Sequence, residues 1–194
     1  MSSLRAFALT IFAFLVLPGS ALAQSPSTGG AEYVAPPPEN ITAPGAKAKL
    51  LPDGTAAAPA DAPVEVQQAI WAANRLKEMP YKYGGGHAKV EDNGYDCSGT
   101  VSYALIHAGL LASPLPSGDF MRWGERGRGT WITVFANGGH AYAMIAGLRL
   151  DTSAYATRSA RVPRRYTKAF ERGPRWRPYK RPARGFRKRH PVGF

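Results

Sequence analysis

Residues 94–105, GYDCSGTVSYAL, hold the single cysteine of this 194-residue chain at the start of a predicted helix. Cys97, Val101 and the apolar residues after them recur at spacings of three and four, which predicts a helix over about residues 97–111. Asp96 stands directly before it, and aspartate is a favoured N-cap because its carboxylate accepts hydrogen bonds from the exposed N–H groups. Cys97 is therefore expected in the first turn, where those N–H groups and the helix dipole favour a thiolate.

The chain after this helix predicts an antiparallel sheet. Strands are expected at 130–136, 140–145 and 147–152, and an Asn-Gly-Gly turn at 137–139 joins the first two. Helices followed by antiparallel strands are typical of the α+β class. His140 opens the second strand directly after the two glycines, which permit close approach of the chain.

A thiolate, an imidazole and a third polar group that orients the ring are the parts needed for nucleophilic acyl transfer. Cys97, His140 and Asp151, eleven residues further on, are the candidates for these parts. Spacing alone is not specific, because many pairs of Cys and His can be imagined together. A lone cysteine can also be a small, inert and buried hydrophobic residue, and this alternative stays open here.

Three stretches together resemble the NlpC/P-sixty family of cell-wall cysteine peptidases. They are PYKYGGGH at 80–87, GYDCSGTVSYAL at 94–105 and Gly-Gly-His-Ala at 138–141, and the resemblance extends over about residues 62–151. It implies a papain-like core with permuted order, in which the helix carrying the cysteine packs on an antiparallel sheet carrying the histidine. It also implies hydrolysis of an amide bond in the peptide stems of peptidoglycan, without a metal or an organic cofactor.

The same resemblance implies a role for individual residues. Cys97 would be the nucleophile and His140 the general base and then the acid. Tyr81, Asp96 and Ser98 would shape the pocket for the substrate.

Two positions depart from the pattern of the family. The third catalytic residue is usually His, Asn or Gln, whereas Asp151 stands in the corresponding place. A small residue is usual two positions after the histidine, whereas this chain has Tyr142, which bears on substrate preference.

The N-terminus has the pattern of an export signal over residues 1–23. A short basic start precedes a twelve-residue apolar run at 6–17, and Ala-Leu-Ala at 21–23 matches a cleavage site. The run is too short for a membrane span, which needs about 20 apolar residues. We predict a mature chain that begins at Gln24 and is secreted or periplasmic.

The mature chain divides by composition. Residues 24–60 are rich in Pro, Ala and Gly and predict a linker. Residues 61–157 are predicted to form the catalytic core. Its first helix would run from Pro63 to about Met79, with Asp61 as its cap.

The C-terminal segment 158–194 carries most of the excess positive charge. It contains 14 of the 25 Lys and Arg residues and one of the 13 acidic residues, interleaved with aromatic residues. Such a mixture is typical of nucleic-acid binding, but export argues against a nucleic-acid partner. We expect the segment to pack partly on the core and to attract anionic wall polymers or a membrane surface.

Other candidate residues favour structural roles. His87 is interpreted as a loop residue, His107 as solvent-facing and His190 as part of the tail, and the four histidines lack metal-ligand spacing, so no metal site is expected. Phe135 and two tryptophans are predicted core residues.

The predicted function is that of an exported peptidoglycan hydrolase. The alternatives are a different amide specificity, or a catalytically silent papain-like protein that holds anionic envelope polymers through its basic segment.

Overall fold

The computed structural model describes residues 40–153, 173–178 and 181–194, all of which belong to one compact unit, Pro36–Phe194. The predicted signal peptide 1–23, the start at Gln24 and the first part of the predicted linker lie outside the described residues. Within the described ranges, no helix has both the length and the apolar character that a membrane span requires.

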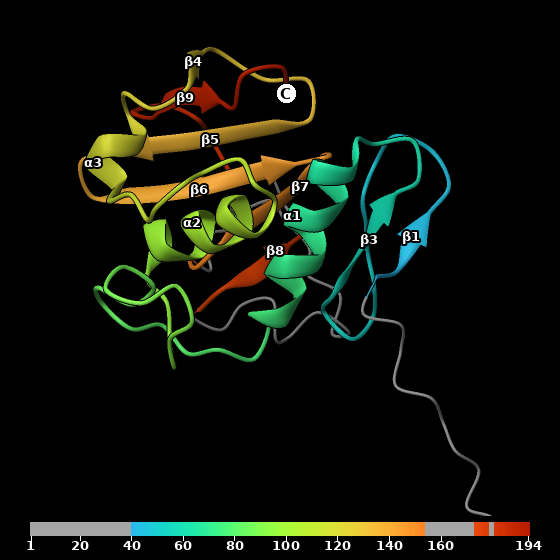
Figure 1. The fold of residues 1–194 in the computed structure, drawn as a ribbon, viewed down its shortest axis with the longest axis horizontal. Helices are drawn as coiled ribbons and strands as arrows, with labels where there is room; N and C mark the ends of the chain where they lie inside the picture. Colours follow the sequence, from blue (N-terminus) through green and yellow to red (C-terminus); the bar gives the residue numbers. More distant parts are fainter. Residues whose placement is uncertain (1–39, 154–172, 179–180) are drawn as a thin grey trace, which may run out of the picture. The chain divides into compact units, whose positions relative to one another are not determined.

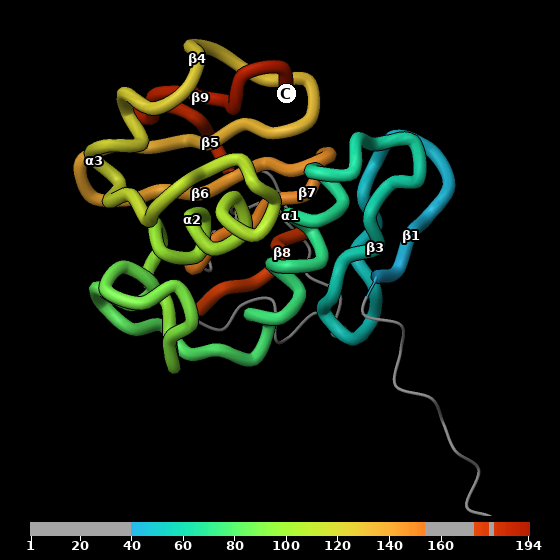
Figure 2. Tube along the Cα trace, viewed as in Figure 1, coloured from blue at the N-terminus to red at the C-terminus, as the bar shows by residue number. Residues whose placement is uncertain are grey.

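A six-stranded antiparallel sheet and the helices on one of its faces organise this unit (Figures 1 and 2). The strand order is β4-β9-β5-β6-β7-β8, and a second small sheet has the order β1-β3-β2. The α+β class predicted from the sequence is confirmed. The helices are α1 (Val64–Arg75), α2 (Cys97–His107) and α3 (Ser117–Phe120), and the strands are β1 (Thr42–Ala43), β2 (Lys49–Leu50), β3 (Ala56–Pro59), β4 (Glu125–Arg126), β5 (Ile132–Asn137), β6 (His140–Ile145), β7 (Leu148–Asp151), β8 (Arg175–Arg177) and β9 (Arg187–His190).

Helix α2 packs on β6 through small residues of the strand. Ala141 and Ala143 alternate with larger residues along β6, and both belong to the buried core with Val101 and Leu105 of the helix. Alanine methyl groups let the helix backbone approach the sheet closely, because a strand presents alternate side chains to opposite faces. The core therefore lies between the helices α1 and α2 and one face of the central strands.

Both helices end earlier than predicted. Helix α2 stops at His107 instead of residue 111, because Gly109 adopts a positive φ of 70° and the Leu110 N–H bonds back to the Leu105 carbonyl. Helix α1 stops at Arg75, and its N-cap is Pro63 without a side-chain hydrogen bond, so Asp61 does not cap it.

Residues 40–60 belong to the folded unit, which corrects the linker predicted over 24–60. Strand β3 is fully buried, and the Asn74 side chain pairs with both backbone groups of Ala56, at 2.8 Å to the N–H and 2.9 Å to the carbonyl. Trp71 donates from Nε1 to the Ile41 carbonyl at 3.0 Å. These partners lie far along the chain, so the local composition did not reveal them.

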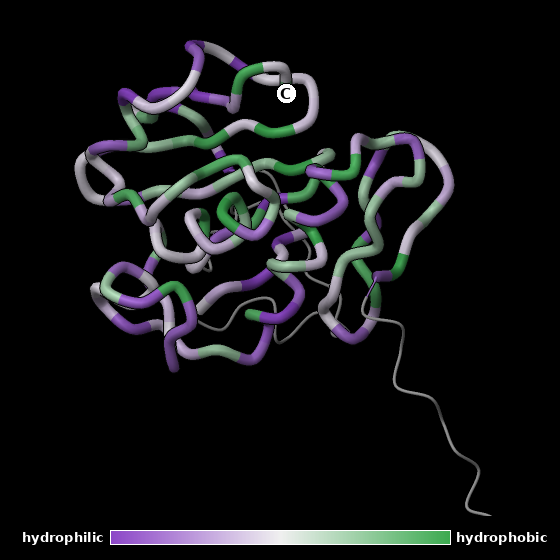
Figure 3. Tube along the Cα trace, viewed as in Figure 1, coloured by the Kyte–Doolittle hydropathy of each residue, from purple (hydrophilic) through white to green (hydrophobic). Residues whose placement is uncertain are grey.

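The C-terminal segment supplies two strands of the main sheet, which extends the core beyond the predicted boundary at residue 157. Strand β9 pairs with β5, and β8 pairs with β7. Both strands are hydrophilic in Figure 3 although they lie within the sheet. Buried Arg177 donates to the Asp151 carbonyl at 3.0 Å, and buried Arg189 donates to the Met121 carbonyl at 2.8 Å. The prediction that the segment packs partly on the core therefore holds for its described part.

Candidate active site

Asp96 caps α2 and orders the loop in front of it. Its Oδ1 accepts a hydrogen bond from the Gly99 N–H at 2.7 Å, and its Oδ2 accepts one from the Gly84 N–H at 3.1 Å. One carboxylate thus satisfies a helix N–H that has no partner within the helix and also anchors the glycine-rich loop. The predicted capping role of Asp96 is confirmed.

Close backbone contact explains two of the glycines. A side chain at Gly99 would collide with the Gly85 carbonyl, and a side chain at Gly85 would collide with the Gly94 carbonyl. The Asp96 N–H donates to that same Gly85 carbonyl at 3.2 Å. The loop therefore lies directly on the first turn of α2 and holds Cys97 at a defined position.

Cys97 and His140 meet where the start of α2 reaches the start of β6. The Cys97 thiol and the His140 ring lie close enough for each to shift the pKa of the other, and the Ala141 N–H also lowers the pKa of the thiol. Cys97 is 9% exposed and the His140 side chain 18% exposed, so the pair is largely, but not completely, shielded from water. The two side chains predicted from the sequence are thus brought together.

Asp151 completes the group from the neighbouring strand. Its Oδ1 lies 2.9 Å from His140 Nε2 and also accepts the Ser153 N–H at 2.8 Å. Its side chain is fully buried, and two guanidinium groups face its Oδ2, Arg181 Nη1 at 3.3 Å and Arg149 Nε at 3.5 Å. A buried carboxylate in this position fixes both the orientation and the tautomer of the imidazole.

These contacts shift the ionisation of all three groups toward their charged forms. Burial alone would raise the pKa of the Cys97 thiol, but the hydrogen bonds from His140 and the Ala141 N–H lower it below its usual value. Burial would lower the pKa of His140, yet the hydrogen bonds to Asp151 and Cys97 raise it to about 9. Burial opposes ionisation of Asp151, but His140 and Arg149 lower its pKa. The arrangement favours the thiolate and the imidazolium over the neutral thiol and imidazole.

The other three predicted site residues lie in front of and at the start of α2. Tyr81 forms an isolated β-bridge with Tyr95, two residues before Cys97, and the residue is 42% exposed. Asp96 and Ser98 are buried, and Ser98 Oγ lies 3.2 Å from Asp96 Oδ1. The polar atoms of these two buried residues act within the cap, while Tyr81 presents exposed surface.

His87 contacts the start of α2, which the sequence analysis did not predict. Its Nε2 lies 3.0 Å from Asp96 Oδ1 and 3.2 Å from Ser98 Oγ, so this loop histidine belongs to the cap of α2. Its place in the motif PYKYGGGH was the available signal.

Two residues of the C-terminal segment were missed altogether. The Phe186 ring lies 6.2 Å from the His140 ring and 5.2 Å from the Tyr142 ring, between ring centroids. Arg181 contacts Asp151, as described above. Nothing in the local sequence distinguishes these two from their basic and aromatic neighbours.

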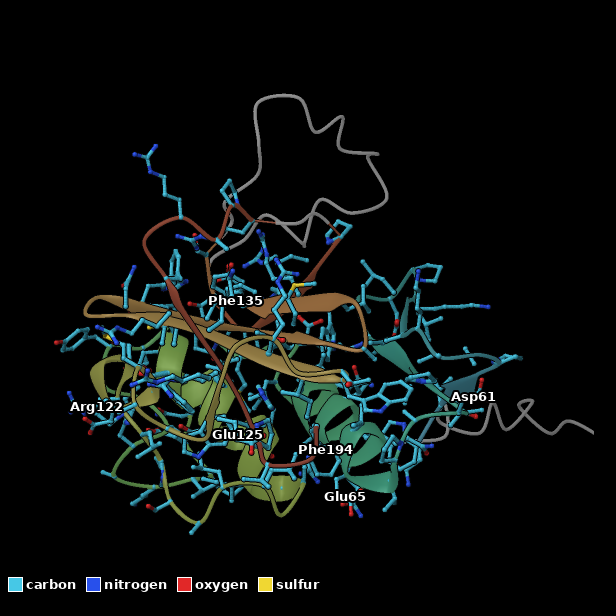
Figure 4. The ribbon with its side chains drawn as sticks, turned by 90° about the horizontal axis from the view of Figure 1, so that it is seen from above. Asp61, Glu65, Arg122, Glu125, Phe135 and Phe194 are labelled. Atoms are coloured by element: carbon cyan, nitrogen blue, oxygen red, sulfur yellow. The ribbon has the colours of Figure 1, made fainter. Side chains whose placement is uncertain are left out.

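The remaining histidines and Phe135 differ partly from expectation. His107 pairs with Glu91 at 3.0 Å instead of facing solvent alone, and His190 is a residue of β9 rather than of a tail. Phe135 is buried, but it stacks on Tyr142 on the face of the sheet turned away from the helices (Figure 4). Within the described ranges, no group of three or more His, Cys, Asp or Glu side chains could hold a metal ion.

Comparison with known proteins adds no assignment: no protein-family model matches the sequence, and no curated protein matches it.

Proposed function

We propose that this protein is an exported thiol hydrolase of the NlpC/P-sixty type, with a papain-like core, that cleaves an amide bond in the stem peptides of peptidoglycan. One observation carries the proposal: the Cys97 thiol and the His140 ring are close enough to shift the pKa of each other, and His140 Nε2 lies 2.9 Å from the buried Asp151 carboxylate. Those are the parts of a nucleophile, a general base and an orienting group. The choice of peptidoglycan rests on the resemblance of the motifs around these residues.

The first chemical step uses the ion pair. The Cys97 sulfur attacks the carbonyl carbon of the amide, an S–C bond forms, and the carbonyl electrons move to oxygen. The N–H groups of Cys97 and Ser98 open α2, where helical N–H groups have no partner within the helix, and they are the candidate donors to that oxygen. The His140 imidazolium then gives its proton to the departing nitrogen, the C–N bond breaks, and a thioester remains.

The second step releases the product. His140, now neutral, takes a proton from water as the water oxygen attacks the thioester carbon. The S–C bond breaks, and the sulfur leaves as the thiolate beside the protonated imidazole. Asp151 keeps one ring nitrogen of His140 occupied throughout, so the other exchanges the proton.

The test combines product release with thiol reactivity. Purified sacculi treated with the mature protein should release stem-peptide fragments, and Cys97→Ala should abolish this release while the folded state, measured by circular dichroism, is retained. Mass spectrometry of products from a defined stem peptide would identify the bond. Equal release by Cys97→Ala and the parent would overturn the proposal.

A thiol-reactive probe separates this proposal from a catalytically silent wall-binding protein. Because the chain has a single cysteine, all labelling reports on Cys97. Labelling well below pH 8, slowed by stem peptide, is expected of the hydrolase. Labelling that needs alkaline pH, together with binding to sacculi that weakens with salt, would instead favour the silent protein.

A further inference from the structure

The C-terminal segment contacts Asp151 at both its main chain and its side chain. Strand β8 pairs with β7 so that Asp151 lies opposite Arg175, and Arg177 Nε donates to the Asp151 carbonyl at 3.0 Å. Arg181, four residues further on, donates from Nη1 to Asp151 Oδ2 at 3.3 Å. The carboxylate that orients His140 is therefore held by a part of the chain that lies outside the motifs around the candidate catalytic residues.

Two aromatic rings hold the Arg181 guanidinium group beside this carboxylate. Its Cζ lies 5.6 Å from the centroid of the Tyr142 ring and 5.1 Å from that of the Phe186 ring. The centroids of these two rings are 5.2 Å apart, and their planes meet at 78°. Cation–π contact with both rings restricts a long side chain that is costly to order by itself. The Arg181 side chain is 17% exposed, so water screens its contact with Asp151 only in part.

Arg149 is a second cation beside the same oxygen. It lies two residues before Asp151 on β7, and its Nε is 3.5 Å from Asp151 Oδ2. Because it belongs to the same strand, its position follows from the strand itself. Arg181 comes from a different part of the chain, and it can therefore be replaced without changing any residue of β7.

The proposed reaction changes the charge next to Asp151. His140 is an imidazolium when the thiolate attacks and a neutral imidazole in the thioester. A buried carboxylate without a cation nearby is costly and tends to take up a proton. While the ring is neutral, the cations at Oδ2 keep Asp151 ionised, so that Oδ1 continues to accept the hydrogen bond from His140.

We propose that Arg181 is a positioning residue, which holds the Asp151 carboxylate in the orientation that directs Oδ1 at His140 in both charge states of the ring. Tyr142 and Phe186 in turn hold Arg181. Tyr142 and Asp151 are the two positions that depart from the pattern of the NlpC/P-sixty family, and both contact Arg181. The role in catalysis rests on the proposed function, whereas the effect on the thiol and the imidazole does not.

Reactivity of Cys97 tests this positioning without any substrate. The rate of labelling by iodoacetamide is measured against pH, and its midpoint reports the pKa of the thiol because the chain has a single cysteine. Arg181→Met removes the charge and the donors but keeps an unbranched side chain that can pack between the two rings. A loosened Asp151 supports the imidazolium less and hence the thiolate less, so the midpoint should rise by about one pH unit or more.

The sign of the shift separates positioning from charge alone. If Asp151 stayed in place, loss of a nearby cation would favour the imidazolium and would leave the midpoint unchanged or lower it. Either of these results would overturn the proposal. Arg181→Lys keeps the charge and a donor, so it should bring the midpoint at least about halfway back to that of the parent. No recovery in Arg181→Lys would trace the effect to packing and would also overturn the proposal.

Arg184→Met is the matched control. Arg184 is an exposed arginine three residues further on, and within the described ranges it forms no hydrogen bond or ion pair with Asp151. Its midpoint should stay within about 0.3 pH unit of the parent. Equal shifts in the two methionine variants would trace the effect to the net charge of the segment and would overturn the proposal. Circular dichroism checks folding, and Arg181→Gln carries the same comparison if Arg181→Met does not fold.

Hydrolysis of a defined stem peptide then tests the link to catalysis. Arg181→Met should lower kcat at least about tenfold and change KM less than about twofold, because a positioning residue does not touch the substrate. A loss confined to KM would overturn the proposed role. A raised labelling midpoint in a protein that hydrolyses no stem peptide would support the positioning while overturning the proposed function. Hydrolysis by the parent with an unchanged midpoint in Arg181→Met would do the reverse.

Discussion

Two histidine–carboxylate pairs with nearly equal N···O distances precede and follow Cys97 in the sequence. His87 and Asp96 are 3.0 Å apart in the cap of α2, and His140 and Asp151 are 2.9 Å apart on the sheet. His87 also contacts the Ser98 hydroxyl, whereas His140 contacts the Cys97 thiol. The two histidines are therefore distinguished by the third group near each ring, a hydroxyl for His87 and a thiol for His140, and not by the carboxylate.

The carboxylates of the two pairs also differ in the groups that they contact. Asp96 accepts N–H groups from α2 and from the glycine-rich loop, which makes it part of the scaffold. Asp151 is fully buried against His140 and two arginines. Removing each pair should therefore change different measured quantities, activity for one and stability for the other.

The largest expected effect separates the two histidines. His140→Gln should lower kcat/KM by roughly 10²–10⁴-fold, because general acid–base catalysis is lost. His87→Gln should lower it by less than about tenfold, since Gln can still bond to Asp96. Stem-peptide hydrolysis by both variants measures this. Equal losses in the two would mean that the histidines cannot be distinguished by their contacts.

Asp151→Asn should slow turnover at least tenfold while substrate binding is unchanged. The neutral amide stabilises an imidazolium less than a carboxylate does, and its NH₂ group can fix the wrong tautomer of His140. Values of kcat and KM for the purified variant, with circular dichroism as the check on folding, measure the effect. A rate equal to that of the parent would remove Asp151 from the site.

The pH profile of kcat/KM should also distinguish the two histidine–carboxylate pairs. Because the pKa of His140 is raised to about 9, activity should fall as the pH rises through about 9 and the imidazolium is lost. In Asp151→Asn this alkaline limb should move to lower pH, since the hydrogen bond that raises the pKa is gone. His87→Gln should leave the limb in place. An alkaline limb unaffected by Asp151→Asn would contradict the assignment.

The same shift predicts a pH dependence of stability. A group whose pKa is raised on folding stabilises the protein fully below its unfolded value, here about 6.5, and that stabilisation is lost as the pH rises through the folded value of about 9. The difference in unfolding free energy between the parent and His140→Gln should therefore shrink between these pH values. Urea unfolding at several pH values measures it, and a constant difference would contradict the raised pKa.

The smallest expected effect belongs to the cap. Asp96→Ala removes the N-cap of α2 and should lower the free energy of unfolding by about 1–2 kcal/mol. Asp96→Asn keeps an acceptor for the Gly99 N–H and should cost less. Urea unfolding of both variants measures the difference. A stability loss as large in Asp96→Asn as in Asp96→Ala would place the effect in the charge rather than in the cap.

Local sequence patterns predicted the structure correctly where the interacting residues lie close together in the sequence. The cap of Asp96 on α2 acts over three residues, and the β5–β6 hairpin follows from the Asn-Gly-Gly turn. Residues 40–60 were assigned to a linker because alanine has little apolar mass. Their order depends on Asn74 and Trp71 in α1, which the local composition does not reveal.

The amino-acid sequence alone determined the α+β class, the helix that presents Cys97 and the identity of the candidate residues, because short-range periodicity, capping and motif spacing are encoded in neighbouring positions. Only the tertiary structure decided that His87 joins the cap of α2, and that β8, β9 and Arg181 from the basic segment complete the sheet and the surroundings of Asp151. Contacts between positions far apart depend on packing of the whole chain, and no local pattern shows which of several similar arginines makes a given contact.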